Sequence, residues 1–403
     1  MTRLKKVINK FFNYSIDFIN NKTRLNIRHI IAYFLSKLCS NKVNENLIVF
    51  GSNNGKAFSG NSKYLFLYLN QNSNYQCIWF TTSRKVLNDL RNKNYHVISV
   101  KNLIKAIKTL KAAKYIFITH GLGDILMIDF SPQTQLIRLS HGIGIKNLKE
   151  KFSNFFLDFY KKKIRQYLVK RISYVVVTSD KDVKIKKSNF PLPSNKFLKV
   201  GFPRNDILVN FSKEQYLESK KSLAIAENSE VILYAPTFRR YKHTSPLDED
   251  FFKKLNELLI SENKVMLFKP HPSSEKINLD PYTSIKSVDP KVDIMDLLVF
   301  SDLLITDYSS VFFDFLITKR PILFFAYDLE EYSMKRGLYF NYETFVPGPI
   351  VKTKDEFFLK LKTINQWVKD YEAKRNEVQD KYIKYSDGNS IKKIIEFLGL
   401  KLN

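Results

Sequence analysis

The side chains of this sequence that could do chemistry are concentrated in four short motifs. These are S-H-G, A-P-T-F-R-R, K-P-H-P and T-D-Y-S-S, at residues 140–142, 235–240, 269–272 and 306–310. Together they supply imidazole, guanidinium, ammonium and hydroxyl groups, which can accept a proton or bind an anion such as phosphate. Each motif follows an apolar run that is typical of a buried strand. Because ligands of parallel sheets bind at the carboxyl ends of the strands, we expect the four motifs to serve one site.

Two histidines, His141 and His271, are the candidate catalytic residues. An unperturbed imidazole has a pKa of about 6.5, which suits proton transfer at neutral pH. A lone histidine is more often structural, but both of these follow an expected strand. The neighbouring Gly142 would let the backbone approach a ligand closely. His271 stands between Pro270 and Pro272, whose rings restrict the direction of the turn.

The motif T-D-Y-S-S predicts an anion site at the start of a helix. The apolar run ends at Thr306, and Asp307, Ser309 or Ser310 can cap the helix that follows. The unpaired N–H groups and the positive end of the helix dipole attract an anion there. Plain N-capping explains one of the serines, but it does not explain Asp314 one turn further on.

Two basic side chains complete the predicted phosphate site. Arg239 follows a proline turn, and its guanidinium group suits bidentate recognition of phosphate, although paired arginines are usually just solvated. Lys269 opens the K-P-H-P motif. We predict that both contact a phosphorylated substrate.

Acidic pairs with the spacing of metal ligands occur at residues 180 and 182 and at residues 248 and 250. Both pairs are more typical of helix starts. We therefore predict no metal ligands and no firm cofactor, apart from Mg²⁺ that the phosphates of a substrate could recruit.

The composition indicates a folded protein with an anionic partner. The 403 residues exceed what one hydrophobic core usually organises, so two domains are expected. The formal net charge of +27 favours nucleic acid, acidic lipid or a phosphorylated substrate. No nucleic-acid-binding module is found, and the motifs gather at strand ends instead. We therefore predict no nucleic-acid partner.

The elements that must position these motifs form an α/β pattern. Apolar strand-like runs alternate with helical runs over residues 43–211, and the alternation restarts over residues 212–375. Continuous apolar strands joined by helices predict doubly wound parallel sheets with helices on both faces. Residues 376–403 read as closing helices. Two such domains would place the site in the cleft between them.

Two basic segments could contact a membrane. Residues 1–42 carry nine Lys/Arg and one acid, with apolar residues at helical spacing, and residues 149–171 have a similar pattern. The alternative is that the apolar faces pack on the core while the lysines are solvated. No secretory signal and no spanning helix are predicted.

The motifs, in this order, resemble those of the CDP-glycerol glycerophosphotransferase family, which includes teichoic acid primases and polymerases and related capsule polymerases. The resemblance spans about residues 48–398, and T-D-Y-S-S-V-F-F-D-F followed by R-P-I is its most specific block. The other matching stretches are H-G-I-G-I-K, V-G-F-P-R-N-D, A-P-T-F-R, K-P-H-P, G-P-I and D-G-N-S-I-K-K-I-I-E-F-L.

The resemblance implies a GT-B fold of two Rossmann-like domains, with the closing helices returning to the N-terminal one. It implies an enzyme that transfers an alditol phosphate from a CDP-activated donor to a lipid-linked polymer, with release of CMP. The enzyme would act as a peripheral protein on the cytoplasmic face of the cell membrane. The histidine of the family's H-G motif carries over to His141 as general base, and the lysine of that motif carries over to Lys146.

One departure from the family stands beside the histidine. The family usually has H-G-T-P-L-K, whereas this chain has Ile143 and Gly144 in place of threonine and proline. We expect the preference for a particular alditol to be set there. The alternatives are a GT-B glycosyltransferase that uses a nucleotide sugar and a non-catalytic basic protein that binds membrane or nucleic acid.

Overall fold

The computed structural model describes residues 21–144, 155–239, 241, 245–270, 277–289, 292–338 and 340–403. The described residues divide into two compact units. The first unit takes in Met1–His141, Phe159–Val175 and Leu400–Asn403, and the second takes in Gly142–Asp158 and Val176–Gly399. The predicted motifs are therefore shared between two bodies.

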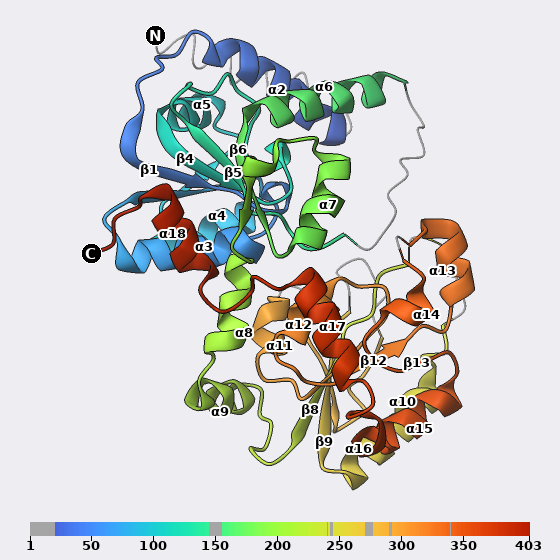
Figure 1. Cartoon of the computed structure of the whole chain (residues 1–403). Helices are drawn as coiled ribbons and strands as arrows, with labels where there is room; N and C mark the ends of the chain where they lie inside the picture. The colour runs from blue at the N-terminus through green and yellow to red at the C-terminus, as the bar shows by residue number, and fades with distance from the viewer. Residues whose placement is uncertain are drawn as a thin grey trace. The chain divides into compact units, whose positions relative to one another are not determined.

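Within the described part of the chain, the first sheet has seven strands in the order β3-β2-β1-β4-β5-β6-β7. Of these, β1, β4, β5 and β6 are labelled in Figure 1. They are β1 (Asn44–Phe50), β2 (Gln76–Thr81), β3 (Val97–Ser99), β4 (Ala113–Ile118), β5 (Gln135–Arg138), β6 (Ile172–Val177) and β7 (Phe197–Lys199). β1 pairs in parallel with both β2 and β4. The strand order reverses between β1 and β4, so their carboxyl ends form a switch point where ligands of such sheets bind.

The second sheet repeats this order. Its six strands in the described residues run β10-β9-β8-β11-β12-β13. They are β8 (Glu230–Tyr234), β9 (Lys264–Phe268), β10 (Ile285–Ser287), β11 (Leu303–Thr306), β12 (Ile322–Phe325) and β13 (Ile350–Val351). β8 pairs in parallel with β9 and β11, which puts a second switch point after Tyr234 and Thr306. The predicted α/β class with two parallel sheets is confirmed.

Helices connect the strands. Up to residue 200 they are α2 (Asn21–Ser36), η1 (Asn53–Gly55), α3 (Gly60–Asn72), α4 (Arg84–Asn92), α5 (Leu103–Ala112), η2 (Leu122–Asp124), α6 (Phe155–Arg171), α7 (Asp180–Asn189) and η3 (Ser194–Lys196). After it they are η4 (Pro203–Asn205), α8 (Asp206–Asn210), α9 (Lys213–Ser222), α10 (Glu249–Ser261), α11 (Ile294–Leu298), α12 (Val311–Leu316), α13 (Leu329–Arg336), α14 (Tyr342–Phe345), α15 (Lys354–Lys362), α16 (Ile364–Trp367), α17 (Glu372–Tyr382) and α18 (Ser390–Leu398).

The acidic pairs lie at helix starts, as predicted. α7 begins at Asp180 behind the N-cap Ser179, whose hydroxyl accepts the N–H of Asp182. α10 begins behind the N-cap Asp248, whose carboxylate accepts the N–H of Phe251 at 2.9 Å. The Ser179 hydroxyl and the Asp248 carboxylate each satisfy a free N–H group of the first helical turn, which is the usual function of N-cap residues.

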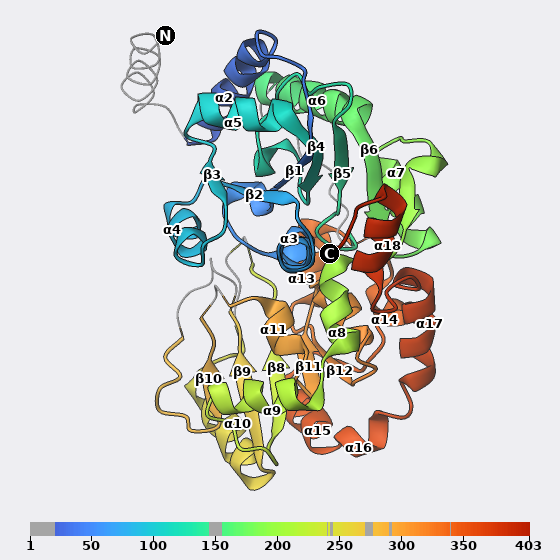
Figure 2. The same cartoon turned by 90° about the vertical axis from the view of Figure 1, so that its left-hand side faces the viewer.

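Helix α2 packs against its unit with an unusually polar face. The Nδ1 atom of His29 accepts the N–H of Met127, and the hydroxyl of Ser36 accepts the N–H of Asp129, both at 2.8 Å. Burial lowers the pKa of His29 to about 4, so its ring is neutral at physiological pH. α2 and α6 lie side by side in both views (Figures 1 and 2), and the rings of Tyr33 and Tyr167 meet edge to face at 5.8 Å.

The two units do not follow the predicted boundary at residue 211. Residues 159–175 group with the first unit because β6 pairs with β5. Thr178 donates its hydroxyl to the carbonyl of Tyr382, and Asp206 accepts the N–H groups of Ser390 and Ile391. Residues 178 and 206 were placed in the N-terminal domain by the sequence analysis, and they group with the closing helices in the second unit.

Replacing Gly348 by alanine is predicted to destabilise the second unit. A Cβ atom at Gly348 would lie 2.0 Å from the carbonyl oxygen of Ile322, and this neighbour is backbone of β12 that cannot rotate away. We expect a loss of about 3 kcal/mol in the free energy of unfolding, measured as a lower urea midpoint. Gly399→Ala is the matched control, since nothing lies within 4 Å of its Cβ, and its left-handed φ costs only about 1–2 kcal/mol. Equal midpoints for the two variants would contradict this packing.

Candidate functional site

At the first switch point, the buried carboxylate of Asp124 joins the loops that follow β1 and β4. It accepts the N–H of Asn54 at 2.6 Å, of Thr119 at 2.7 Å and of His120 at 2.8 Å. Hydrogen bonds to an ionised carboxylate are about twice as strong as neutral ones. The loop packs so closely that a Cβ at Gly51 would lie 2.5 Å from the Asp124 carbonyl oxygen. Asp124 thus fixes the position of His120.

His141 follows β5 on a loop that Asn61 holds in place. The side-chain amide of Asn61 donates to the carbonyls of Leu139 at 3.0 Å and Ser140 at 2.8 Å. Ser140 has a left-handed φ of 63°, which turns the chain just before the histidine. The His141 side chain is exposed, and its ring stacks on that of His120 with 4.4 Å between centroids and 16° between planes. The predicted catalytic histidine is therefore accessible and held on a braced loop.

His120 is a residue that the sequence analysis missed. It follows the apolar strand β4 as His141 follows β5, so the same signal, a histidine at a strand end, was present. Its Nδ1 accepts the N–H of Asn53 at 3.2 Å and lies 2.8 Å from the hydroxyl oxygen of Thr119. The structure places this imidazole against that of the predicted base, His141.

The residues after His141 belong to the second unit. A Cβ at Gly142 would lie 3.4 Å from Nη2 of Arg204 and 3.5 Å from Oγ of Ser310, so the glycine keeps this approach open. Ile143 is buried, with 4% of its surface exposed, whereas Gly144 is exposed. The predicted ligand Lys146 lies outside the described residues.

Arg204 is the second residue that the sequence analysis did not assign. Its Nη2 and Nε donate to the two carboxylate oxygens of Asp314, at 2.8 and 3.2 Å, and Asn205 donates to Asp314 at 2.7 Å. A planar guanidinium held in this way has a fixed direction. Because Ser310 and Gly142 lie beside it, Arg204 is placed to bind an anion. Asp314, predicted to bind the donor, instead orients Arg204. Arg204 could have been found from the sequence, because it belongs to the motif V-G-F-P-R-N-D.

At the second switch point, Asp307 joins the loops that follow β8 and β11. Its carboxylate accepts the N–H of Thr237 at 2.9 Å and pairs with Arg239 at 2.8 Å. The hydroxyl of Thr306 donates to the carbonyl of Ala235 at 2.8 Å. Both Thr306 and Asp307 are buried, so they hold these two loops together and do not face solvent.

Arg239 is enclosed by acids and aromatic rings. Its guanidinium pairs with Asp307 and Asp328, and its side chain is only 2% exposed. It lies 4.9 Å from the ring centre of Tyr308 and 5.2 Å from that of Tyr332. We therefore revise its predicted role: the guanidinium organises this loop, because carboxylates already occupy the directions in which it could bind phosphate.

The electrostatics of this cluster favour the charged pair. Burial lowers the pKa of Arg239, but the nearby Asp307 and Asp328 outweigh burial and leave this pKa raised. Burial raises the pKa of Asp328, but hydrogen bonds from Arg239, Tyr308 and Tyr241 leave it below its ordinary value. The stability from Asp328 is thus present above its unfolded pKa, about 4, and is lost as the pH falls through the lower folded value.

The serines stand where the motif predicted, but the helix is short. α12 has six residues, and its N-cap Ser310 makes no side-chain capping bond. The hydroxyl of Ser309 accepts the N–H of Val311 at 3.4 Å. A helix of this length has a weak dipole, so the serine hydroxyls and Arg204 are the stronger anion-binding groups here.

The K-P-H-P motif is only partly described. Lys269 follows β9, burial lowers its pKa, and its Nζ lies 3.4 Å from the carbonyl oxygen of Asp289. The other predicted residue of this motif, His271, lies outside the described residues. The phosphate-binding roles of both stay predictions.

Among the described residues, no group of three or more His, Cys, Asp or Glu side chains is arranged to hold a metal ion. The acids of the site are engaged: Asp124 by backbone N–H groups, Asp307 and Asp328 by Arg239, and Asp314 by Arg204. Nor is any helix in the described part of the chain long and apolar enough to cross a membrane.

The two arginines should separate in mutagenesis. Arg239→Ala leaves two buried carboxylates without their cation, so we expect a loss of about 3–5 kcal/mol in the free energy of unfolding. Arg204→Lys keeps a positive charge but loses the two-pronged geometry, so we expect near-normal thermal unfolding and about a tenfold or greater fall in kcat/KM for a CDP-activated donor.

Arg91→Lys, at the exposed C-terminal end of α4, is the control for loss of a guanidinium as such. A folded and stable Arg239→Ala with a raised KM for the donor would instead favour the predicted phosphate-binding role. Unchanged kinetics of Arg204→Lys would remove Arg204 from the site.

Comparison with known proteins agrees with this geometry. The chain is 30% identical to the teichoic acid glycerol-phosphate transferase of Staphylococcus aureus (strain NCTC 8325 / PS 47), over 94% of this chain and 99% of that one. It is 33% identical to a teichoic acid poly(glycerol phosphate) polymerase of Bacillus spizizenii, over 88% of this chain and 92% of that one. A structure of the wall teichoic acid polymerase TagF matches with a TM-score of 0.78 and 26% identity, over 95% of this chain and 98% of that one.

The profile of the CDP-Glycerol:Poly(glycerophosphate) glycerophosphotransferase family matches residues 32–399. The predicted GT-B class and the predicted resemblance are thereby confirmed, and a glycosyltransferase or a non-catalytic protein is not favoured. The chain belongs to the CDP-Glycerol:Poly(glycerophosphate) glycerophosphotransferase family and is a transferase that moves an alditol phosphate from a CDP-activated donor to a growing polymer.

Proposed function

We propose that this enzyme transfers glycerol phosphate from CDP-glycerol to a terminal hydroxyl of a lipid-linked acceptor. Two relatives of at least 30% identity are named as glycerol-phosphate enzymes. A variant of TagF whose structure matches with a TM-score of 0.77 was soaked with CDPG. Ribitol-phosphate polymerases match at 28% identity, so ribitol phosphate is the competing cargo.

The chemical step uses His141 as general base. The acceptor hydroxyl oxygen attacks the phosphorus that carries glycerol, the bond from that phosphorus to the bridging oxygen breaks, and CMP leaves with the bond electrons. The hydroxyl proton goes to the His141 imidazole. The supporting observation is that this ring is exposed on a loop braced by Asn61. Orientation of this kind supplies much of the rate in phosphoryl transfer, which needs little covalent chemistry from the protein.

Positive groups stabilise the charge that builds up on the phosphates. We assign this role to Arg204, fixed by Asp314, and to the hydroxyl of Ser310 beside it. Lys269, His271 and Lys146 stay in the proposal as further cationic or donor groups. Arg239 and Asp307 are assigned an indirect role, because their ion pair holds in place the loop that carries the T-D-Y-S-S motif.

Mg²⁺, if used, would be held by the donor's diphosphate. The carboxylates near the site already accept hydrogen bonds from arginines or backbone N–H groups, so they form no ready cage for a resident ion. Ile143 is buried and Gly144 exposed, so of the two departures only Gly144 could face a donor directly. Ile143 would influence alditol preference through packing.

We expect His141→Ala to lower kcat with CDP-glycerol by about 10²–10⁴-fold, the range for loss of a general base. Release of labelled CMP measures the rate, with CDP-ribitol and a UDP-sugar as competing donors. His96→Ala replaces another exposed histidine of the same unit and serves as control. Turnover of His141→Ala near that of the unaltered enzyme would reject the base assignment, and release of a nucleoside diphosphate would reject alditol-phosphate transfer.

The enzyme is also proposed to work at the cytoplasmic surface of the membrane, where a lipid-linked acceptor is available. Helix α2 supports this because polar side chains lie on its buried face and apolar side chains lie on its exposed face. His29, Ala32 and Ser36 face the protein and are buried. The opposite stripe is apolar and exposed, with exposed fractions of 42% for Ile30 and 62% for Phe34, and it continues into Leu38, which follows the end of α2 and is 86% exposed. An apolar stripe that faces outward from a buried polar face indicates an apolar partner.

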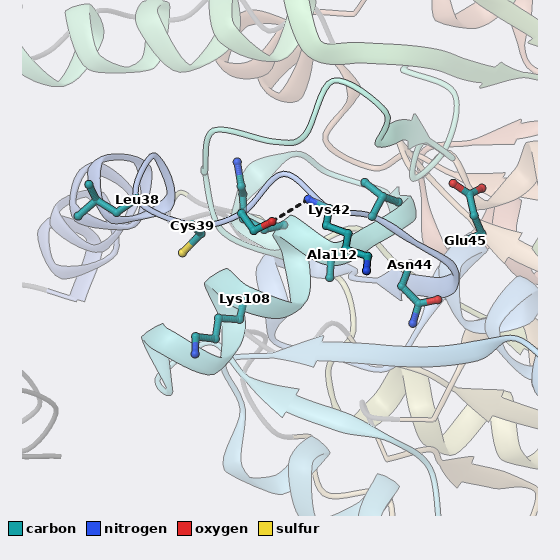
Figure 3. A pocket seen from close by; sticks show the side chains of 10 residues that line it. Leu38, Cys39, Lys42, Asn44, Glu45, Lys108 and Ala112 are labelled. Carbon is teal, nitrogen blue, oxygen red and sulfur yellow. Dashed lines mark hydrogen bonds between the residues drawn. The ribbon is translucent and has the colours of Figure 1, made fainter. Parts of the chain in front are cut away.

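Basic groups flank the end of this stripe. An open pocket of about 810 Å³ is lined by Leu38 and by the basic residues Lys42 and Lys108 (Figure 3). Lys37 is exposed and lies 5.0 Å from the ring centre of Tyr33. Apolar side chains next to lysines suit insertion into a bilayer with anionic headgroups. Two other segments were predicted to contact the membrane. Residues 1–20 and much of residues 149–171 lie outside the residues whose side chains the structure describes.

Replacing Ile30, Phe34 and Leu38 together by glutamine should weaken membrane binding at least about tenfold, because each loses its apolar contact with the bilayer. Flotation with phosphatidylglycerol-containing liposomes measures the bound fraction. The matched control replaces three exposed apolar residues of the second unit, Val209, Met334 and Leu359. Undiminished flotation of the α2 variant would move the contact to another segment, such as residues 149–171.

A further inference from the structure

His120 and His141 form a stacked pair of imidazoles in the first unit. Their ring centroids are 4.4 Å apart and their planes differ by 16°. The rings come from different loops: His120 follows β4 and His141 follows β5. Each loop is braced separately, the first by Asp124 and the second by Asn61. The stack is therefore a contact between two fixed supports.

The surroundings of His120 select one form of its ring. Nδ1 accepts the backbone N–H of Asn53 at 3.2 Å, so this nitrogen uses its lone pair and carries no proton. In the neutral ring the proton is then on Nε2. The hydroxyl of Thr119, 2.8 Å from Nδ1, can donate to the same atom. These contacts hold the ring in a single orientation beneath His141.

The charged groups near the pair are engaged with other partners. Asp124 is the nearest acid, with Oδ1 4.0 Å from Nδ1 of His120. Its carboxylate is already engaged by the N–H groups of Asn54, Thr119 and His120, and Arg138 adds a positive charge that interacts with it. On the open side, the ring that faces His120 is His141.

We propose that His120 is a positioning residue for the catalytic base, acting as a flat neutral platform on which the His141 ring rests. It keeps the His141 nitrogen aimed at the acceptor hydroxyl. When His141 takes up the hydroxyl proton, the resulting imidazolium lies over the face of a neutral aromatic ring, an arrangement that attracts cations. This inference rests on the proposed function, because it presumes that His141 is the base.

The test compares three variants that separate the ring from its hydrogen bond. His120→Phe keeps a flat ring but accepts no hydrogen bond. His120→Asn keeps an acceptor for the N–H of Asn53 but has no ring, and His120→Ala lacks both. We expect kcat to fall about 10–100-fold in the Asn and Ala variants, the scale of a misplaced catalytic group. We expect kcat of the Phe variant to stay within about fivefold of the unaltered enzyme. KM for CDP-glycerol should change less than about twofold in all three.

Thermal unfolding shows whether each variant is folded. If the Ala variant does not fold, the comparison of the Phe variant with the Asn variant still tests the proposal. High activity of Asn with low activity of Phe would overturn the proposal, since the hydrogen bond rather than the ring would matter. A rise in KM with unchanged kcat would overturn it too, by indicating donor binding. Normal activity of all three variants alongside an inactive His141→Ala would reject the platform and leave the base intact. An active His141→Ala would instead reject the proposed function.

Discussion

In each unit, one buried aspartate binds the loops at the point where the strand order reverses. Asp124 joins the loops after β1 and β4, and Asp307 joins those after β8 and β11. Loops at the ends of parallel strands present N–H groups that no strand neighbour satisfies. A carboxylate satisfies several of them at once, and the charge strengthens each bond. The loop that carries His120 and the loop that carries the T-D-Y-S-S motif depend on these two carboxylates.

The two units use this arrangement for different purposes. In the first unit Asp124 accepts hydrogen bonds from backbone N–H groups and from the hydroxyl of Thr119, and the ring of His120 stacks on that of His141. In the second unit Asp307 also takes the guanidinium of Arg239, with Asp328 and tyrosine rings around it. A cation enclosed in this way contributes to the shape of the loop. Arg204 is only oriented by its acid and lies beside Gly142 and Ser310, so it is the arginine better suited to a ligand.

Helix α2 carries the surface for which we proposed membrane contact. When the buried face of a helix is polar and its exposed face is apolar, contact of the exposed face with water does not stabilise the helix. The net charge of +27 is consistent with an anionic surface and with an anionic donor, so the charge alone does not distinguish them. The exposed stripe Ile30, Phe34 and Leu38 is the observation behind the proposed membrane contact, because a soluble phosphorylated substrate does not require exposed apolar side chains.

The sequence by itself determined the α/β class and the family, and it predicted a site at the strand ends with His141 as general base. These follow from local pattern: apolar runs, turn residues and motif order. Only the tertiary structure showed that Arg239 is enclosed by Asp307 and Asp328 whereas Arg204 is oriented by Asp314, because these partners are far away in sequence. It also brought His120 to His141. Contacts between loops of neighbouring strands depend on strand order, which no single motif encodes.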